Sequence, residues 1–122
     1  MTKTMPVQAL QRMLIRVEYD GTGLVGWQRQ DNGPSVQAIL EQAAEKLTTR
    51  PTPVHGSGRT DAGVHATGQA AHLDVPNHLT ATDVMRGLNA VLETNQVSVV
   101  SAKPVAPSFN ARFDAVQRSY LY

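Results

Sequence analysis

Residues 13–19 (MLIRVEY) decide the fold class, because apolar and polar side chains alternate along this stretch. One side of the alternation carries Ile15, Val17 and Tyr19, and the other carries Leu14, Arg16 and Glu18. This is the period of a strand with one buried face. Residues 20–23 (DGTG) then end the strand.

An amphipathic helix is predicted next. Pro34 and Ser35 form a helix start, and helical spacing continues to Arg50 and Pro51 through the apolar residues Val36, Ile39, Leu40, Ala43, Ala44 and Leu47. Residues 54–59 and 68–75 then resemble two short strands that form a hairpin around the loop between them.

A second helix and a fourth strand complete the pattern. Thr80 or Thr82 can cap the helix, whose apolar side contains Val84, Met85, Leu88 and Leu92. Residues 97–105 read as a strand, and residues 116–122 as the start of a further, incomplete strand. The order β-α-β-β-α-β predicts an α+β, ferredoxin-like antiparallel sheet with two helices on one face. We expect residues 1–12 to be a flexible N-terminal segment and residues 13–122 to form one domain.

Composition limits the chemistry available to this 122-residue chain. It has no cysteine, which excludes disulfides, thiolate metal sites and cysteine nucleophiles, and favours the cytoplasm. No run of about 18 apolar residues is present, so no membrane contact is expected. The net charge is only +1, but most basic residues are arginine, which favours bidentate contacts to phosphate or carboxylate.

Residues 58–65 (GRTDAGVH) form the most informative loop. Arg59 precedes Asp61 by two residues, between glycines that allow a close approach to the main chain. A guanidinium can keep the neighbouring carboxylate ionised, and an ionised aspartate can act as nucleophile or base. The alternative is a strand-end turn in which the two residues form an ordinary surface ion pair.

Other interpretations of this region fit its spacing less well. A phosphate loop would need a glycine where Asp61 stands. A metal site from His55, His65, His72 and Asp61, or a catalytic triad from Ser57, His65 and Asp74, matches no standard spacing. Trp27 is expected to pack rather than stack on a base. Periodicity leaves open whether Tyr120 faces the core or a cleft.

Several motifs together resemble the TruA family of tRNA pseudouridine synthases. They are residues 17–21 (VEYDG), 26–30 (GWQRQ), 35–37 (SVQ), 58–65 (GRTDAGVH), 68–69 (GQ), Asn89, 109–113 (FNARF) and 120–122 (YLY). Their order and approximate spacing agree with the family from about Leu14 to Tyr122.

The resemblance implies an enzyme that isomerises uridine at positions 38 to 40 of the tRNA anticodon stem-loop, without cofactor or metal. It implies that Asp61 is the catalytic nucleophile. Arg59 would pair with Asp61 and hold the flipped nucleotide, and Tyr120 would stack on the target uracil. We expect further RNA contacts from Arg29, Arg112 and Arg118, whose alternative is that they are solvated charges.

Two departures from the family pattern stand out. Asn110 replaces the histidine that some members carry, and is expected to be tolerated. Family members also continue into a second, similar half, so the chain is interpreted as an amino-terminal half that is inactive alone. Its unfinished strand would favour a homodimer. The competing hypotheses are a non-catalytic RNA-binding module of the RRM type and a metal-dependent hydrolase using His55, Asp61 and His65.

Overall fold

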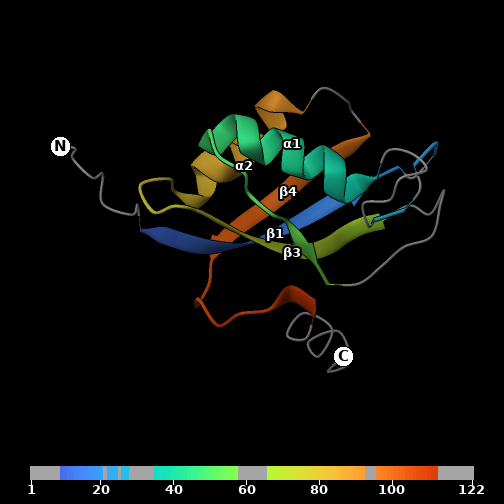
Figure 1. Ribbon diagram of the computed structural model, residues 1–122. Helices are drawn as coiled ribbons and strands as arrows, with labels where there is room; N and C mark the ends of the chain where they lie inside the picture. The colour runs from blue at the N-terminus through green and yellow to red at the C-terminus, as the bar shows by residue number, and fades with distance from the viewer. Residues whose placement is uncertain are drawn as a thin grey trace.

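The structure of the chain is a computed structural model that describes residues 9–20, 22–24, 26–27, 35–57, 66–92 and 96–112. Four strands form one antiparallel sheet in the order β2-β3-β1-β4 (Figure 1). They are β1 (Leu10–Tyr19), β2 (His55–Gly56), β3 (Ala66–Pro76) and β4 (Val97–Pro104).

Two helices, α1 (Val36–Thr48) and α2 (Ala81–Val91), lie side by side on one face of the sheet (Figure 1). The β-α-β-β-α-β order, the antiparallel sheet and the position of the helices confirm the predicted ferredoxin-like α+β class. The predicted extra strand at residues 116–122 lies outside the described residues.

The main core lies between the sheet and the helices. The alternation along β1 sends Met13, Ile15 and Val17 to this side, where none is more than 1% exposed. They pack with Leu40 of α1 and Leu88 of α2, both of which are buried. The apolar pattern predicted for these three elements therefore forms one continuous core.

Both helices begin at residues that the sequence marks as caps. The Ser35 hydroxyl accepts a hydrogen bond from Ala38 N at the start of α1. At α2 the cap is Thr80 rather than Thr82, because Thr80 and Asp83 bind each other's backbone N–H groups in a capping box.

The observed strands differ in length from the predicted ones. Strand β1 begins at Leu10, which pairs with Pro76, so residues 10–12 belong to the sheet and not to a flexible segment. Strand β3 extends over Ala66–Pro76, beyond the predicted 68–75. Strand β2 contains His55 and Gly56. Val54 and Ser57 of the predicted range lie outside it, and residues 58–59 lie outside the described residues.

The chain after β4 turns back over the sheet face opposite the helices, called the open face below (Figure 1). There Phe109 and Ala111 pack with Leu14 of β1 and Ala70 of β3 in a second, smaller cluster. Residues 109–112 therefore lie next to strands that are far away in the sequence.

Candidate functional site

The loop at residues 58–65, which contains Arg59 and Asp61, lies outside the described residues, and so do Arg29, Arg118 and Tyr120. Of the predicted site residues, the structure describes Arg112 alone. It also describes the residues that flank the loop on both sides: Ser57, which directly follows β2, and Ala66 at the start of β3.

Helix α1 fixes the chain that leads into β2. The side-chain amide of Gln37 donates to Val54 O at 3.1 Å, and Val54 N donates to the Glu41 carboxylate at 2.9 Å. Beyond β2, Ser57 N donates to Ala70 O at 2.8 Å. These contacts hold a two-residue strand in place even though it has few pairing partners of its own.

Trp27 forms the floor beneath β2. Its side chain is 3% exposed and belongs to the main core, so the predicted packing role is confirmed. A Cβ added at Gly56 would lie 2.5 Å from the indole Nε1, so only glycine fits here without movement. The backbone carbonyls of Gly26 and Trp27 accept from Val36 N and Gln37 N, which anchors this segment to the start of α1.

Strand β3, which follows the loop, contains a β-bulge near its start. The pairing of β1 with β3 shifts between Val17 and Glu18, and Gly68 has a φ of 131°. This conformation strains any residue other than glycine. Arg16 Nη1 lies 3.4 Å from the Gly68 carbonyl oxygen, a long contact. Bulges redirect a strand, and this one lies three residues after His65.

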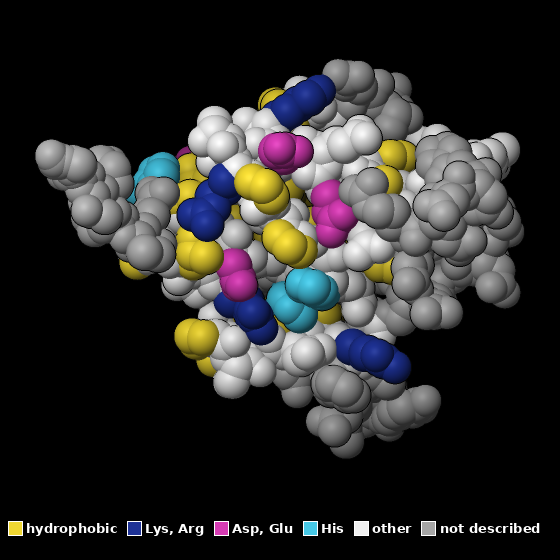
Figure 2. Space-filling model, viewed as in Figure 1, with side chains coloured by type: hydrophobic (Ala, Val, Ile, Leu, Met, Phe, Trp, Pro, Cys, Tyr) yellow, Lys and Arg dark blue, Asp and Glu magenta, His cyan; other side chains and the backbone are white. Residues whose placement is uncertain are grey.

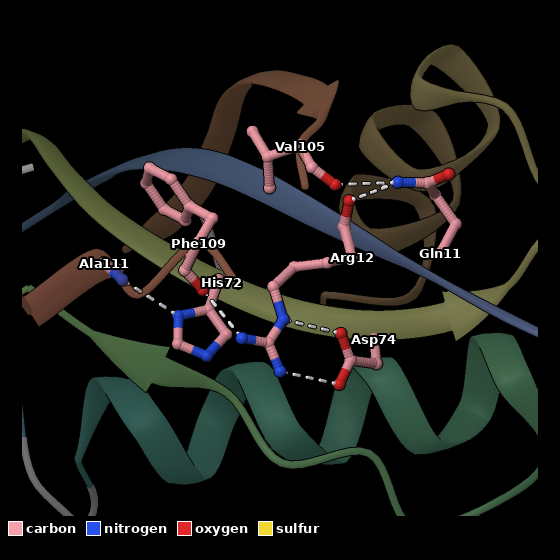
Figure 3. Close-up of polar contacts among 7 residues, drawn as sticks. All are labelled: Gln11, Arg12, His72, Asp74, Val105, Phe109 and Ala111. Atoms are coloured by element: carbon pink, nitrogen blue, oxygen red, sulfur yellow. Dashed lines mark hydrogen bonds and ion pairs between the residues drawn. The ribbon is translucent and has the colours of Figure 1, made fainter. Parts of the chain in front are cut away.

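An ion pair crosses the open face between β1 and β3. Arg12 donates from Nε and Nη2 to the two carboxylate oxygens of Asp74, at 2.9 and 3.1 Å (Figure 3). These hydrogen bonds lower the pKa of Asp74 and raise that of Arg12. Of the alternative triad of Ser57, His65 and Asp74, the structure describes Ser57 and Asp74, while His65 lies outside the described residues.

His72 lies beside this ion pair and is 4% exposed. Its Nδ1 accepts a hydrogen bond from Ala111 N at 3.1 Å, and its ring stacks on His55 at 4.9 Å between centroids. Burial, together with the charge of Arg12 and His55, lowers the pKa of His72 to about 4. The ring is therefore neutral near pH 7 and acts as an acceptor. Within the described ranges, no group of three or more His, Asp or Glu side chains is arranged to hold a metal ion.

Arg112 is exposed, and its backbone N–H donates to the side-chain oxygen of Asn110 at 3.0 Å. Two further basic residues on the open face, Arg16 and Lys103, line a hollow of about 260 Å³. The sequence analysis did not select them. The alternation of side chains along β1 and β4 could have indicated them, because it places Arg16 and Lys103 on the same face of the sheet as Leu14.

On the side of the molecule drawn in Figure 2, the Lys and Arg side chains lie among Asp and Glu side chains and form no single basic patch. This mixture agrees with the net charge of +1. None of the described helices is long and apolar enough to span a membrane.

Comparison with known proteins decides the family. The family model described as "tRNA pseudouridine synthase" matches residues 15–114, a range that includes the whole loop and residues 109–112. The chain belongs to the tRNA pseudouridine synthase family. The resemblance drawn from the motifs is therefore confirmed.

The similar proteins include several bacterial members of this family. The chain is 56% identical over 111 residues to tRNA pseudouridine synthase A of Rhodospirillum rubrum, covering 91% of this chain and 40% of that protein. It is 54% identical over 113 residues to that of Paramagnetospirillum magneticum, and 50% identical over 113 residues to that of Maricaulis maris. These alignments cover 93% of this chain and 44% and 45% of the two relatives. The chain thus spans less than half the length of these relatives.

Proposed function

We propose that this chain forms part of an enzyme that converts uridine to pseudouridine in the tRNA anticodon stem-loop, at positions 38 to 40. The observation that carries the proposal is the family match over residues 15–114, which includes the GRTDAGVH run. The loop starts one residue after Ser57, whose N–H donates to Ala70 O. The residues before Ser57 are held by Trp27 and by α1. A catalytic loop needs flanking residues that are held in place, because small displacements of a reacting group slow the chemistry strongly.

Asp61 is the proposed nucleophile. The reaction breaks the bond between uracil N1 and ribose C1′ and forms a bond between C5 and C1′. The proton on C5 leaves to a base and N1 gains one, so the product is an isomer of the substrate. Asp61 would attack C1′ or C6, or remove a sugar proton to give a glycal, and it must be ionised in each case. Arg59 would keep it ionised by direct pairing.

RNA binding is assigned to aromatic and basic residues. The target base must leave its stack, which costs a few kcal/mol. Stacking on Tyr120 and contacts from Arg59 would offset that cost. Arg29, Arg112 and Arg118 are proposed to contact the tRNA backbone. The exposed position of Arg112 supports this role for that residue.

The second half of the cleft is proposed to come from outside this sequence. We infer that the chain corresponds to an amino-terminal half, since it covers 40 to 45% of three relatives. The enzyme is proposed to work in the cytoplasm and without metal, and this 122-residue chain is proposed to form a homodimer through its unfinished strand. Light scattering after size-exclusion chromatography tests the dimer, which a monomeric mass would contradict.

The activity is tested with the full-length protein and tRNA labelled with tritium at uracil C5. Each isomerisation releases one tritium, so release counts turnovers. We expect release from a tRNA with uridines at positions 38 to 40, and none from the same tRNA with cytidines there. Binding of both tRNAs without release would instead favour the non-catalytic RNA-binding module.

A further inference from the structure

Residues 109–112 are attached to the open face by hydrogen bonds to side chains of two strands. These strands are distant in the sequence: of the two residues that bind the segment, the nearer one, His72, is 39 positions from Ala111. We propose that Arg12 and His72 are positioning residues, which hold this segment so that Arg112 meets a phosphate of the tRNA. The proposal rests on the proposed function and assigns to it two residues that do not themselves touch the substrate.

Arg12 forms the first attachment. Two of its guanidinium nitrogens bind Asp74, and the third, Nη1, donates to Phe109 O at 2.7 Å (Figure 3). Because the guanidinium is planar, the two contacts to Asp74 fix the direction of the third donor. Phe109 itself is 8% exposed and packs on Leu14 and Ala70, so its backbone and its side chain are both held.

His72 forms the second attachment. Its Nδ1 accepts from Ala111 N (Figure 3). Its ring is held between the stacked ring of His55 and the edge-on ring of Phe109. Ala111 is fully buried. A buried backbone N–H without a partner is costly, so this bond selects one position for the segment.

The segment changes from buried to exposed within one residue, since Ala111 is 0% exposed and Arg112 is exposed. The Asn110 side chain accepts from Arg112 N and forms a tight local turn. The turn fixes where the Arg112 backbone leaves the sheet, and Arg112 is exposed at this point.

The sheet register places the residue that binds Ala111 opposite β2, the strand that precedes residues 58–65 in the sequence. His72, which binds Ala111, pairs with His55 of β2. Ser57 directly follows β2, two residues after His55, and is the last described residue before the loop. Under the proposed function, the partner assigned to Arg112 is a phosphate close to the reacting nucleotide. Arginine contacts to phosphate position RNA without reading its sequence.

The test measures tRNA binding by the full-length protein over a range of salt concentrations. Removing one phosphate contact should lower the slope of log affinity against log salt by about 0.7 to 0.9. We expect this change in Arg112→Gln and, because the segment is released, also in His72→Leu. The double variant should bind no more than about twofold weaker than Arg112→Gln alone, because both changes remove one contact.

His72→Asn is the matched control, since its side-chain oxygen can accept from Ala111 N, and it should restore the slope to within experimental error of wild type. Hydrogen exchange gives a separate measurement, in which the Ala111 amide should exchange at least about tenfold faster in His72→Leu than in wild type. If His72→Leu does not fold, Arg12→Gln replaces it, alone and in the double variant with Arg112→Gln.

Additive losses in the double variant, or an unchanged salt slope in Arg112→Gln, would overturn the proposal. Unchanged exchange at Ala111 would do so as well. Failure of the proposed function appears differently, as absence of tritium release by the wild-type protein, and leaves the exchange and binding results to decide the positioning role.

Discussion

At the scale of single residues, Gly56 lies against the Trp27 indole with no room for a side chain. We expect Gly56→Ala to lower the free energy of unfolding by about 1 to 3 kcal/mol, since a rigid ring and the β2 backbone must separate. Chemical denaturation measures the change.

Gly87→Ala is the control for this substitution. Its added Cβ would meet only the end of the flexible Leu47 side chain. Alanine also favours the helix by up to about 1 kcal/mol over glycine, so stability should change by less than about 1 kcal/mol. Equal losses in both variants would mean that the contact between Trp27 and β2 is not a tight one.

His72 makes stability depend on pH. Its pKa falls from the ordinary value of 6.5 to about 4 in the folded chain, mainly through burial. Arg12 and His55 add to the decrease, and Asp74 opposes it. The unfolded chain therefore binds more protons between these two values. The stabilising effect is complete above pH 6.5 and decreases as pH falls to about 4.

Thermal unfolding at several pH values measures this effect. We expect the difference in Tm between wild type and His72→Asn to change between pH 6.5 and 4, and to stay constant from pH 7 to 8, because asparagine does not titrate. A constant difference across the whole range would show that His72 has no lowered pKa.

At the scale of elements, Asn89 connects α2 to β4, which lies at one edge of the described sheet. Its side-chain amide donates to Val99 O and accepts from Val99 N, both at 2.9 Å. This pair of bonds satisfies backbone groups next to the irregularity where Arg16 pairs with Ser101 but Val17 pairs with Val99. The Asn89 side chain thus provides the hydrogen bonds that a neighbouring strand would otherwise make to Val99.

We predict that Asn89→Ala lowers the free energy of unfolding by about 1 to 3 kcal/mol, because both backbone groups of Val99 lose their partner. Thr82→Ala, an exposed position on the same helix, should stay within about 0.5 kcal/mol. Denaturant titration that ranks Asn89→Ala with Thr82→Ala would contradict the role of Asn89.

The long periodic elements were predictable from sequence, and the short ones were not. Strand β1 and both helices carry their period in their own residues. Strand β2 is short because Gln37, Glu41 and Trp27, from other elements, determine where it pairs. Arg12 was assigned to a flexible segment because its partner, Asp74, lies 62 residues away and gives no local signal.

At the scale of the whole molecule, the sequence motifs indicated the family, but not how the fold arranges those motifs that the structure describes. The fold places residues 109–112 against β1 and β3, on the face away from the helices (Figure 1). No spacing predicts this, because the segment is attached through backbone groups that every residue carries. The role of Asp61 stays a prediction.

The most direct measurement of the central claim is tritium release by Asp61→Asn in the full-length protein, beside wild type and Asp83→Asn. Asparagine keeps the shape of the side chain but removes the nucleophile, so turnover should fall by several orders of magnitude while tRNA binding stays within a few-fold. Asp83 lies at the cap of α2, and its variant should stay close to wild type. More than about a hundredth of the wild-type rate in Asp61→Asn would contradict the account.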